Sequence, residues 1–267
     1  MTTIAPPAAS QSNPPAPTRE GATTRLYILG TGLVFPGHLT LQTLGILRSC
    51  RTICTNLPPS DLSRLSDDLR SKTTSLWSLY QQGRNRSDNY QDVAESILRI
   101  AEEQHPVAWL TPGHPLIFDS VSQGLIQACD ARGWRSQVVP AVSCVDAVLA
   151  DLGYDPANGL FVHEAQAVVF QDIPLLPEVA TLLLQPSAFG SDVAHYEEAW
   201  RPDFAPLQEK LLRHFSADHC CAFVRSESLQ GAPRSLHWVE IGALTSVSAK
   251  YILGSSLFIP AEFVPDA

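Results

Sequence analysis

The sequence predicts an α/β protein whose N-terminal half is a parallel sheet covered by helices on both faces. Short apolar runs alternate with longer segments whose apolar residues recur at helical spacing. Two of the runs also end in loops rich in glycine or proline. An alternation of strand and helix is typical of a parallel sheet. In chain order, the expected strands are residues 26–29, 53–55, 107–111 and 137–139.

Four helices are expected in this half of the chain. The first covers residues 40–47, with Thr40 as its cap and leucines on one face. The next two are residues 61–70 and 90–104, and the second of these has an apolar stripe. The last helix runs from about residue 118 to 131 and ends at Gly133.

The second half of the chain predicts a smaller, mixed or antiparallel sheet, because its strands follow one another with short connections. We therefore expect two α/β domains, residues 25–140 and 141–267, after a disordered Pro/Ala-rich tail at 1–24. The elements expected in the second domain are helices at 143–152 and 206–215 and strands at 181–184, 219–224, 236–244 and 256–259.

Composition excludes several classes of partner. The 267 residues carry 18 Lys plus Arg against 27 Asp plus Glu, a net charge of −9. Neither nucleic acid nor an anionic membrane is attracted to such a surface. The apolar runs are too short to cross a bilayer, and we see no secretory leader. Six cysteines without zinc-site spacing indicate reduced thiols in a cytoplasmic protein, and we expect no metal.

Candidate ligand-binding residues follow the expected strands, because ligands bind at the carboxyl ends of parallel strands. Gly30 and Gly32 follow the first strand; this pair suggests a nucleotide, although an ordinary strand-to-helix turn also explains it. Pro112, Gly113 and His114 follow the third strand, and we expect His114 to contact a ligand.

The polar segment from Tyr80 to Tyr90 is the strongest chemical signal, since two phenols flank the guanidinium of Arg86. Such groups suit a site where negative charge builds on an oxygen. The alternative is an exposed loop in which Asp88 or Asn89 caps the next helix, which leaves both tyrosines unexplained. We find no serine-nucleophile, phosphate-loop or zinc-protease motif.

Together these segments resemble the class III S-adenosylmethionine (SAM) dependent methyltransferases, the tetrapyrrole methylase fold. Residues 26–32 with 39–44 are similar to its first strand, loop and helix, and residues 138–143 to its Pro-Gly-Val-Ser segment, with Ala141 in place of glycine. The acidic first-loop motif is replaced by residues 34–37. The resemblance implies two αβα domains with the active site in the cleft between them.

Within that fold the chain resembles the borosins, which N-methylate peptide backbone amides in the biosynthesis of ribosomal peptide products (RiPPs). Two departures stand out. Pro112 occupies a position where borosins have tyrosine, and the chain ends about seven residues after Pro260, where fused borosins continue into a clasp and a core peptide. We therefore expect a split enzyme acting on a separate precursor. The segments that carry the resemblance are residues 80–90, residues 113–115 with 118, residues 150–156 with 164–165, and residues 255–260.

The resemblance also implies roles for individual residues and a homodimer. Arg86 and Tyr80 are expected to stabilise the imidate oxygen of the substrate amide, and Tyr90 to help remove its proton. SAM, which leaves as S-adenosylhomocysteine, is expected to contact residues from both domains. These are Gly30, Gly32, Pro112, Gly113, His114, Ile117, Phe118, Ser143, Cys144, Gln185, Ser255 and Ser256.

Two alternatives remain at the level of sequence. One is a small-molecule methyltransferase of the same fold, including a tetrapyrrole one, although a polycarboxylate would favour a more basic cleft than a chain at −9 suggests. The other is a non-catalytic binding protein on this scaffold, which the replacement at Pro112 keeps open.

Overall fold

The computed structural model describes residues 23–194, 200–227 and 233–262, and these fold as two compact units. The N-terminal unit contains residues 23–147 and residue 227, and the C-terminal unit contains residues 148–194, 200–226 and 233–262. The division falls inside one helix, α6 (Cys144–Leu152), rather than ahead of it at residue 140. The expected tail at 1–24 lies almost entirely outside the described residues.

The N-terminal unit is built on a five-stranded sheet in which all strands run parallel, as the sequence predicts. Its spatial order is β3-β2-β4-β1-β5. One strand was not expected, because it is only three residues long and carries no apolar run. The strands are β1 (Leu26–Gly30), β2 (Thr52–Thr55), β3 (Thr73–Ser75), β4 (Val107–Thr111) and β5 (Ser136–Val139).

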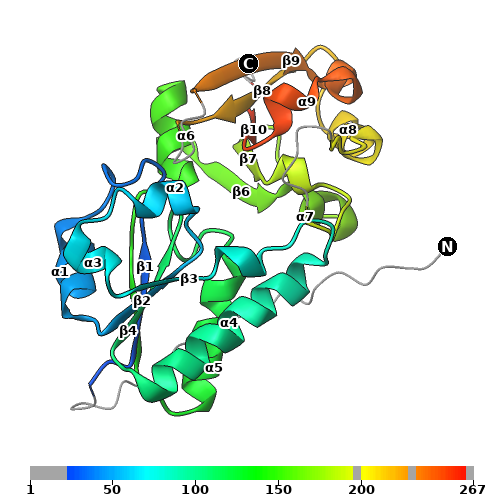
Figure 1. The fold of residues 1–267 in the computed structure, drawn as a ribbon. Helices are drawn as coiled ribbons and strands as arrows, with labels where there is room; N and C mark the ends of the chain where they lie inside the picture. Colours follow the sequence, from blue (N-terminus) through cyan, green and yellow to red (C-terminus); the bar gives the residue numbers. More distant parts are fainter. Residues whose placement is uncertain (1–22, 195–199, 228–232, 263–267) are drawn as a thin grey trace. The chain divides into compact units, whose positions relative to one another are not determined.

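Helices cover both faces of this sheet because successive side chains in a strand point to opposite faces. On β4, Trp109 packs in a buried cluster with residues of α4 (Arg86–Glu103) and α5 (Ser120–Ala131). Its neighbour Leu110 packs in a second cluster with residues of α1 (Leu41–Ser49) and α3 (Asp67–Arg70). Figure 1 shows α1 and α3 on one side of these strands and α4 and α5 on the other. The predicted α/β class is confirmed.

The helix predicted over residues 61–70 is wrong in its extent. Two short helices stand there, α2 (Pro59–Leu62) and α3. Between them the chain makes tighter bonds to the third residue back, from Arg64 N to Asp61 O and from Leu65 N to Leu62 O. The Ser63 hydroxyl also donates to Ser60 O at 2.7 Å, a local bond of the kind that competes with helix continuation.

The C-terminal unit contains a mixed five-stranded sheet of spatial order β6-β7-β10-β8-β9. Only the β6–β7 pair is parallel, which confirms the mixed sheet. The strand expected over 236–244 ends at Glu240, where Gly242 N turns to donate to Ala217 O. The strands are β6 (Leu160–Glu164), which the sequence analysis missed, β7 (Ala180–Leu184), β8 (Cys220–Arg225), β9 (Ser235–Glu240) and β10 (Ser256–Ile259).

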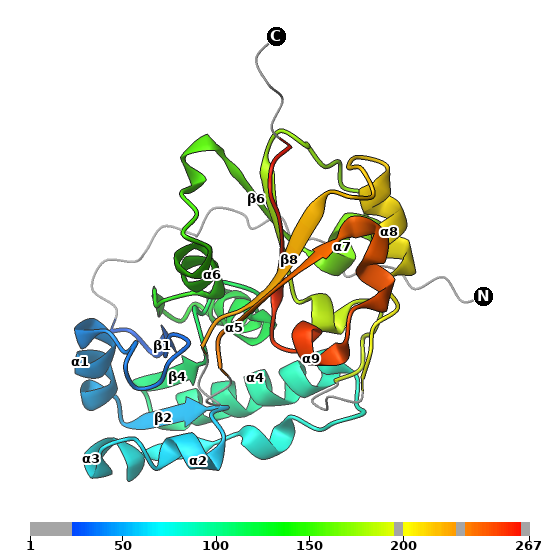
Figure 2. The ribbon, with the colours of Figure 1, turned by 90° about the horizontal axis from the view of Figure 1, so that it is seen from above.

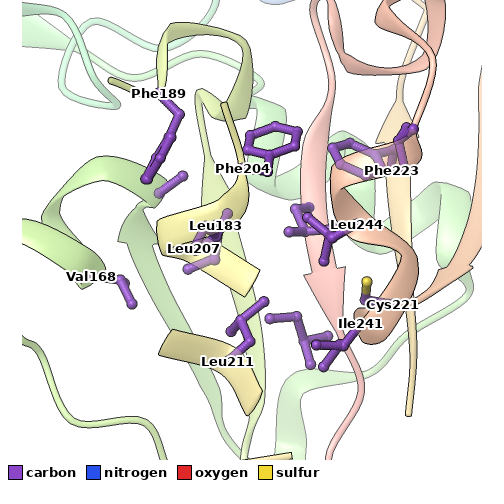
Figure 3. Close-up of a cluster of buried hydrophobic side chains, with 14 of the residues drawn as sticks. Val168, Leu183, Phe189, Phe204, Leu207, Leu211, Cys221, Phe223, Ile241 and Leu244 are labelled. Carbon is purple, nitrogen blue, oxygen red and sulfur yellow. The ribbon is translucent and has the colours of Figure 1, made fainter. Parts of the chain in front are cut away.

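Aromatic rings form the centre of the C-terminal core. Phe204 lies between Phe189 and Phe223, at ring-centroid distances of 5.9 Å on each side (Figure 3). The core lies on the face of the sheet that the small helices cover, and Figure 2 shows them on one side of β6 and β8. These helices are α7 (Ala165–Phe170), α8 (Ala205–Leu212) and α9 (Ala249–Ile252).

Two further features bear on the environment of the protein. All six cysteines are free thiols, and burial raises the pKa of Cys54 to about 12. Within residues 23–194, 200–227 and 233–262, no helix is long and apolar enough to cross a membrane.

Gly30 gives a direct test of how β1 ends. A Cβ on Gly30 would overlap the carbonyl oxygen of Gly113, which is backbone and cannot rotate away. We expect Gly30→Ala to destabilise the unit by about 3 kcal/mol or more. Gly45, in the exposed middle of α1, has no atom within 4 Å of such a Cβ, so Gly45→Ala should stabilise by about 0.5–1 kcal/mol. Chemical denaturation of both variants measures the difference, and a Gly30→Ala protein as stable as the parent would contradict this packing.

Candidate active site

A pocket of about 190 Å³ lies where β2 and β4 end in the N-terminal unit. Asn56 follows β2, Thr111 ends β4, and both line the pocket. Five of the fifteen predicted site residues line it too, so the structure brings these five together. The ten lining residues are Asn56, Tyr80, Tyr90, Thr111, Pro112, Ile117, Phe118, Asp119, Ser120 and Val121.

The two tyrosines form one wall of this pocket. Tyr80 follows a turn of 3-10 helix, Tyr90 is on α4, and their ring centroids are 6.1 Å apart. The loop between them is tied to the helix by Asn89, whose buried side chain donates from Nδ2 to Gln81 O at 2.9 Å. This bond fixes the approach of the loop that follows Tyr80 to the helix that carries Tyr90.

Arg86 is the first residue of α4 and is half-buried. The helix begins there and not at Tyr90, because Asn85 caps it by accepting from Ser87 N at 2.9 Å. The alternative interpretation, in which Asp88 or Asn89 caps this helix, is therefore wrong. The correction strengthens the site, since residues four apart share one face of a helix and Arg86 stands one turn before Tyr90. Arg86 is not among the residues that line the pocket.

The loop from Pro112 to Phe118 forms a second wall. Gly113 has φ +70° and exchanges two backbone hydrogen bonds with Gly32, at 3.0 and 3.1 Å. Phe118 has φ +55°, a left-handed backbone that side chains other than glycine rarely adopt, and 39% of it is exposed. Strained residues of this kind concentrate at ligand sites. Gly30 and Gly32 therefore act by holding this loop, and neither lines the pocket.

His114, Ser143 and Cys144 form a separate group in the same unit, outside the pocket lining. Burial lowers the pKa of His114, and the nearby Asp146 carboxylate opposes this. Burial also acts against ionisation of Asp146, but hydrogen bonds from the hydroxyl and backbone N–H of Ser143 outweigh it and leave its pKa lowered. Burial raises the pKa of Cys144 to about 11, so this thiol is neutral at pH 7.

The N-terminus of α5 forms the floor of the pocket with Asp119, Ser120 and Val121. Asp119 caps the helix by accepting from Ser122 N at 3.0 Å. Its second oxygen accepts from the Ser122 hydroxyl at 2.9 Å, and that hydroxyl accepts from the buried Trp109 Nε1 at 3.1 Å. The carboxylate is thereby held by groups that reach into the sheet core.

Gln185, Ser255 and Ser256 belong to the C-terminal unit, and their role as SAM contacts stays a prediction. Gln185 follows β7 with φ +55°, again a left-handed backbone. Ser255 is buried and donates from its hydroxyl to Ile252 O at 2.7 Å, and Ser256 begins β10.

Sequence reasoning missed five lining residues: Asn56, Thr111, Asp119, Ser120 and Val121. The rule that ligands meet the carboxyl ends of parallel strands points directly to Asn56 and Thr111. The other three become visible only when the start of α5 is placed at Ser120 and its cap at Asp119.

The lining residues suit an adenosyl group. The exposed ring of Phe118 and the side chain of Ile117 offer an apolar surface to a base, and the polar groups of Thr111, Asp119 and Ser120 offer partners to hydroxyls. Among the described residues, no group of three or more His, Cys, Asp or Glu side chains is placed to hold a metal ion.

The imidazole of His114 has a pH response that can be measured directly. We expect NMR titration to give it a pKa below 6.5, since burial disfavours the imidazolium. Asp146→Asn should lower the value further by removing the opposing charge. The unfolded chain binds this proton more tightly than the folded protein does. The free energy of unfolding is therefore fully retained above about pH 6.5, and the part that depends on His114 is lost as the pH falls below that value. A pKa at or above 6.5 in the folded protein would refute this environment.

Comparisons with known proteins identify relatives of the chain. The chain is 26% identical over 196 residues to the methyltransferase/ribosomally synthesized type I borosin cyclic peptide precursor of Mycena rosella, covering 73% of this chain and 49% of the relative. It is also 26% identical over 246 residues to the methyltransferase/ribosomally synthesized cyclic peptide gymnopeptides precursor of Gymnopus fusipes, covering 90% and 58%. The chain thus spans about half the length of the curated relatives it matches.

A solved structure shows the same fold. Uroporphyrin-III-C-methyltransferase from Thermus thermophilus has a TM-score of 0.57 at 19% identity, covering 88% of this chain and 91% of that chain. The family model for Tetrapyrrole (Corrin/Porphyrin) Methylases matches residues 25–231. The chain therefore belongs to the tetrapyrrole methylase family.

Proposed function

We propose that this protein is a SAM-dependent methyltransferase that N-methylates backbone amides of a peptide. The observation that carries the proposal is the pair of Tyr80 and Tyr90 on one pocket wall, with Arg86 one helical turn before Tyr90. The printed names of the curated relatives join a methyltransferase to a cyclic peptide precursor, which supports a peptide as substrate.

The chemistry requires activation of the amide nitrogen, whose lone pair is delocalised into the carbonyl. When bound, SAM supplies an electrophilic methyl group, and we assign its binding to the predicted cofactor contacts, with Ile117 and Phe118 in the pocket. We assign proton removal to Tyr90, directly or through water. Arg86 and Tyr80 stabilise the oxygen that becomes negative as the proton leaves, by charge and hydrogen bonding. The protein must also hold the amide nitrogen in line with the methyl group that is transferred.

A tetrapyrrole substrate is the second candidate, because the name of the structural relative, uroporphyrin-III-C-methyltransferase, includes a tetrapyrrole. The pocket favours the peptide. None of its ten lining residues is a lysine or arginine, and one of them is the carboxylate of Asp119. A polycarboxylate substrate would bring several negative charges toward this acidic group, with Arg86 as the one cation that the proposal assigns to the site, whereas an uncharged peptide backbone carries no such penalty.

Two further parts of the proposal rest on the borosin resemblance. We propose that the substrate is offered by a separate precursor and that the enzyme is a homodimer. The molar mass in solution, measured by light scattering, tests the dimer independently of any activity.

Removal of the Arg86 side chain should lower the rate of catalysis without unfolding the protein. We expect Arg86→Ala to lower the rate of methyl transfer from labelled SAM to peptides by roughly 10²–10³, because one stabilising donor at the oxygen is lost. Arg99→Ala, at an exposed position further along α4, is the matched control and should keep the parent rate. Undiminished turnover by Arg86→Ala would remove Arg86 from the mechanism.

A further inference from the structure

The strand β9 forms one edge of the C-terminal sheet, and its outer side has no neighbouring strand among the described residues (Figure 1). Two large apolar side chains on it are exposed, Leu236 at 43% and Trp238 at 47%. An exposed edge is a template for pairing with another chain, and proteins protect such edges with proline, lysine or a very short strand. β9 has six residues and contains neither proline nor lysine, so its edge is open to a further strand.

The backbone groups that point toward this open edge belong to alternate residues. Directly beyond β9, Ile241 N donates to His219 O at 3.0 Å, which makes these two opposite residues a bonded pair. Bonded and non-bonded pairs alternate along an antiparallel ladder, so the odd-numbered residues of β9 bond to β8. The N–H and C=O groups of Leu236, Trp238 and Glu240 therefore point away from β8.

The two exposed side chains lie on the face of the sheet opposite to the core, since successive residues of a strand alternate between faces. His237 stands between them and points to the core side, where its ring stacks on Tyr251 at a centroid distance of 3.8 Å. Val239 packs against the buried cluster on that side as well. Leu236 and Trp238 thus stand together on the outer face, beside the outward-pointing backbone groups.

We propose that two copies of this chain pair through β9, antiparallel and about a twofold axis at His237. This register places Leu236 of each copy opposite Trp238 of the other, as a pair that exchanges both of its backbone hydrogen bonds. Such an interface is isologous, because the same patch of both copies forms it. The inference rests on the homodimer of the proposed function and assigns its interface.

The side-chain pattern of β9 favours this register. The outward backbone groups of two copies meet only when even-numbered residues face even-numbered residues. With the axis at Trp238, Leu236 would face the carboxylate of Glu240. With the axis at His237, two apolar pairs form and Glu240 faces Arg234, which contacts a carboxylate of its own copy and is still 57% exposed. Aromatic and opposite-charge pairs of this kind stabilise neighbouring strands.

Trp238→Lys tests the interface, because it replaces the largest apolar contact by a charge on the edge. Light scattering over a dilution series should give the mass of two chains for the parent. The variant should dimerise more weakly by roughly 100-fold or more, since each copy loses an aromatic contact at the centre of the pair. Val162→Lys is the matched control: Val162 is 38% exposed on β6, the other edge of the same sheet, and this variant should keep the parent dimer. Far-UV circular dichroism checks that both variants are folded.

Cysteine cross-linking tests the register independently of the lysine variant. Leu236→Cys and Trp238→Cys are made separately, each with Cys220→Ser to remove the exposed native thiol. Opposite residues of a bonded pair have Cα atoms about 5.5 Å apart, which is within the range of a disulfide. A mixture of the two variants should therefore give a linked dimer under mild oxidation. Either variant alone should not, because identical positions stand two residues out of register.

Each outcome decides the inference. A parent protein that is monomeric over the whole series would refute both the homodimer and this interface, and would leave the edge to another occupant such as an extended peptide. A dimer that withstands Trp238→Lys, or that Val162→Lys dissociates to the same degree, would overturn the interface alone. Cross-linking by Trp238→Cys alone, or none in the mixture, would overturn the assigned register. Methyl transfer to peptides, measured separately, tests the rest of the proposed function.

Discussion

The close approach of two backbone loops is the constraint on which the candidate site depends. Gly30 ends β1 directly against the carbonyl oxygen of Gly113, and Gly32 exchanges two hydrogen bonds with Gly113. The first of these contacts leaves no room for a side chain at Gly30. This approach holds the loop from Pro112 to Phe118 over the end of the sheet, and three residues of that loop line the pocket.

A second constraint brings the tyrosines to this loop. The segment before Tyr80 is bonded to the end of β2 through Leu76 N, and Asn89 bonds the loop after Tyr80 to α4. Both tyrosines also pack at the edge of the buried cluster that α4 and α5 form on the sheet. The phenols therefore stand on rigid elements, which is what electrostatic stabilisation of a developing charge requires. The chemistry proposed here uses groups that the fold already holds in place.

Much of this arrangement could be predicted from the sequence, because apolar runs and glycine-rich loops are local signals. β1, β2 and β4 and the first helix were predicted from such signals. Tyr80 and Tyr90 were predicted from the two phenols that flank a guanidinium, and Ile117 and Phe118 from the family resemblance. The misses have physical causes. The start of α4 depends on which of three polar residues caps it, and Asn85 does so. At the break between α2 and α3, the backbone bonds to the third residue back and the Ser63 hydroxyl donates to Ser60 O. Asn56 follows the end of β2 and was within reach of the rule for parallel strands, whereas Asp119, Ser120 and Val121 could be placed only after the start of α5 was known.

The most direct test of the central claim is the chemical identity of the methylated product. The protein is incubated with labelled SAM and a peptide pool, the peptides are hydrolysed, and the amino acids are analysed. We predict that the label is recovered as N-methyl amino acids from within the peptides, and that it is lost with Arg86→Ala. Label on carbon or on side-chain atoms, or transfer to a tetrapyrrole but to no peptide, would contradict backbone N-methylation.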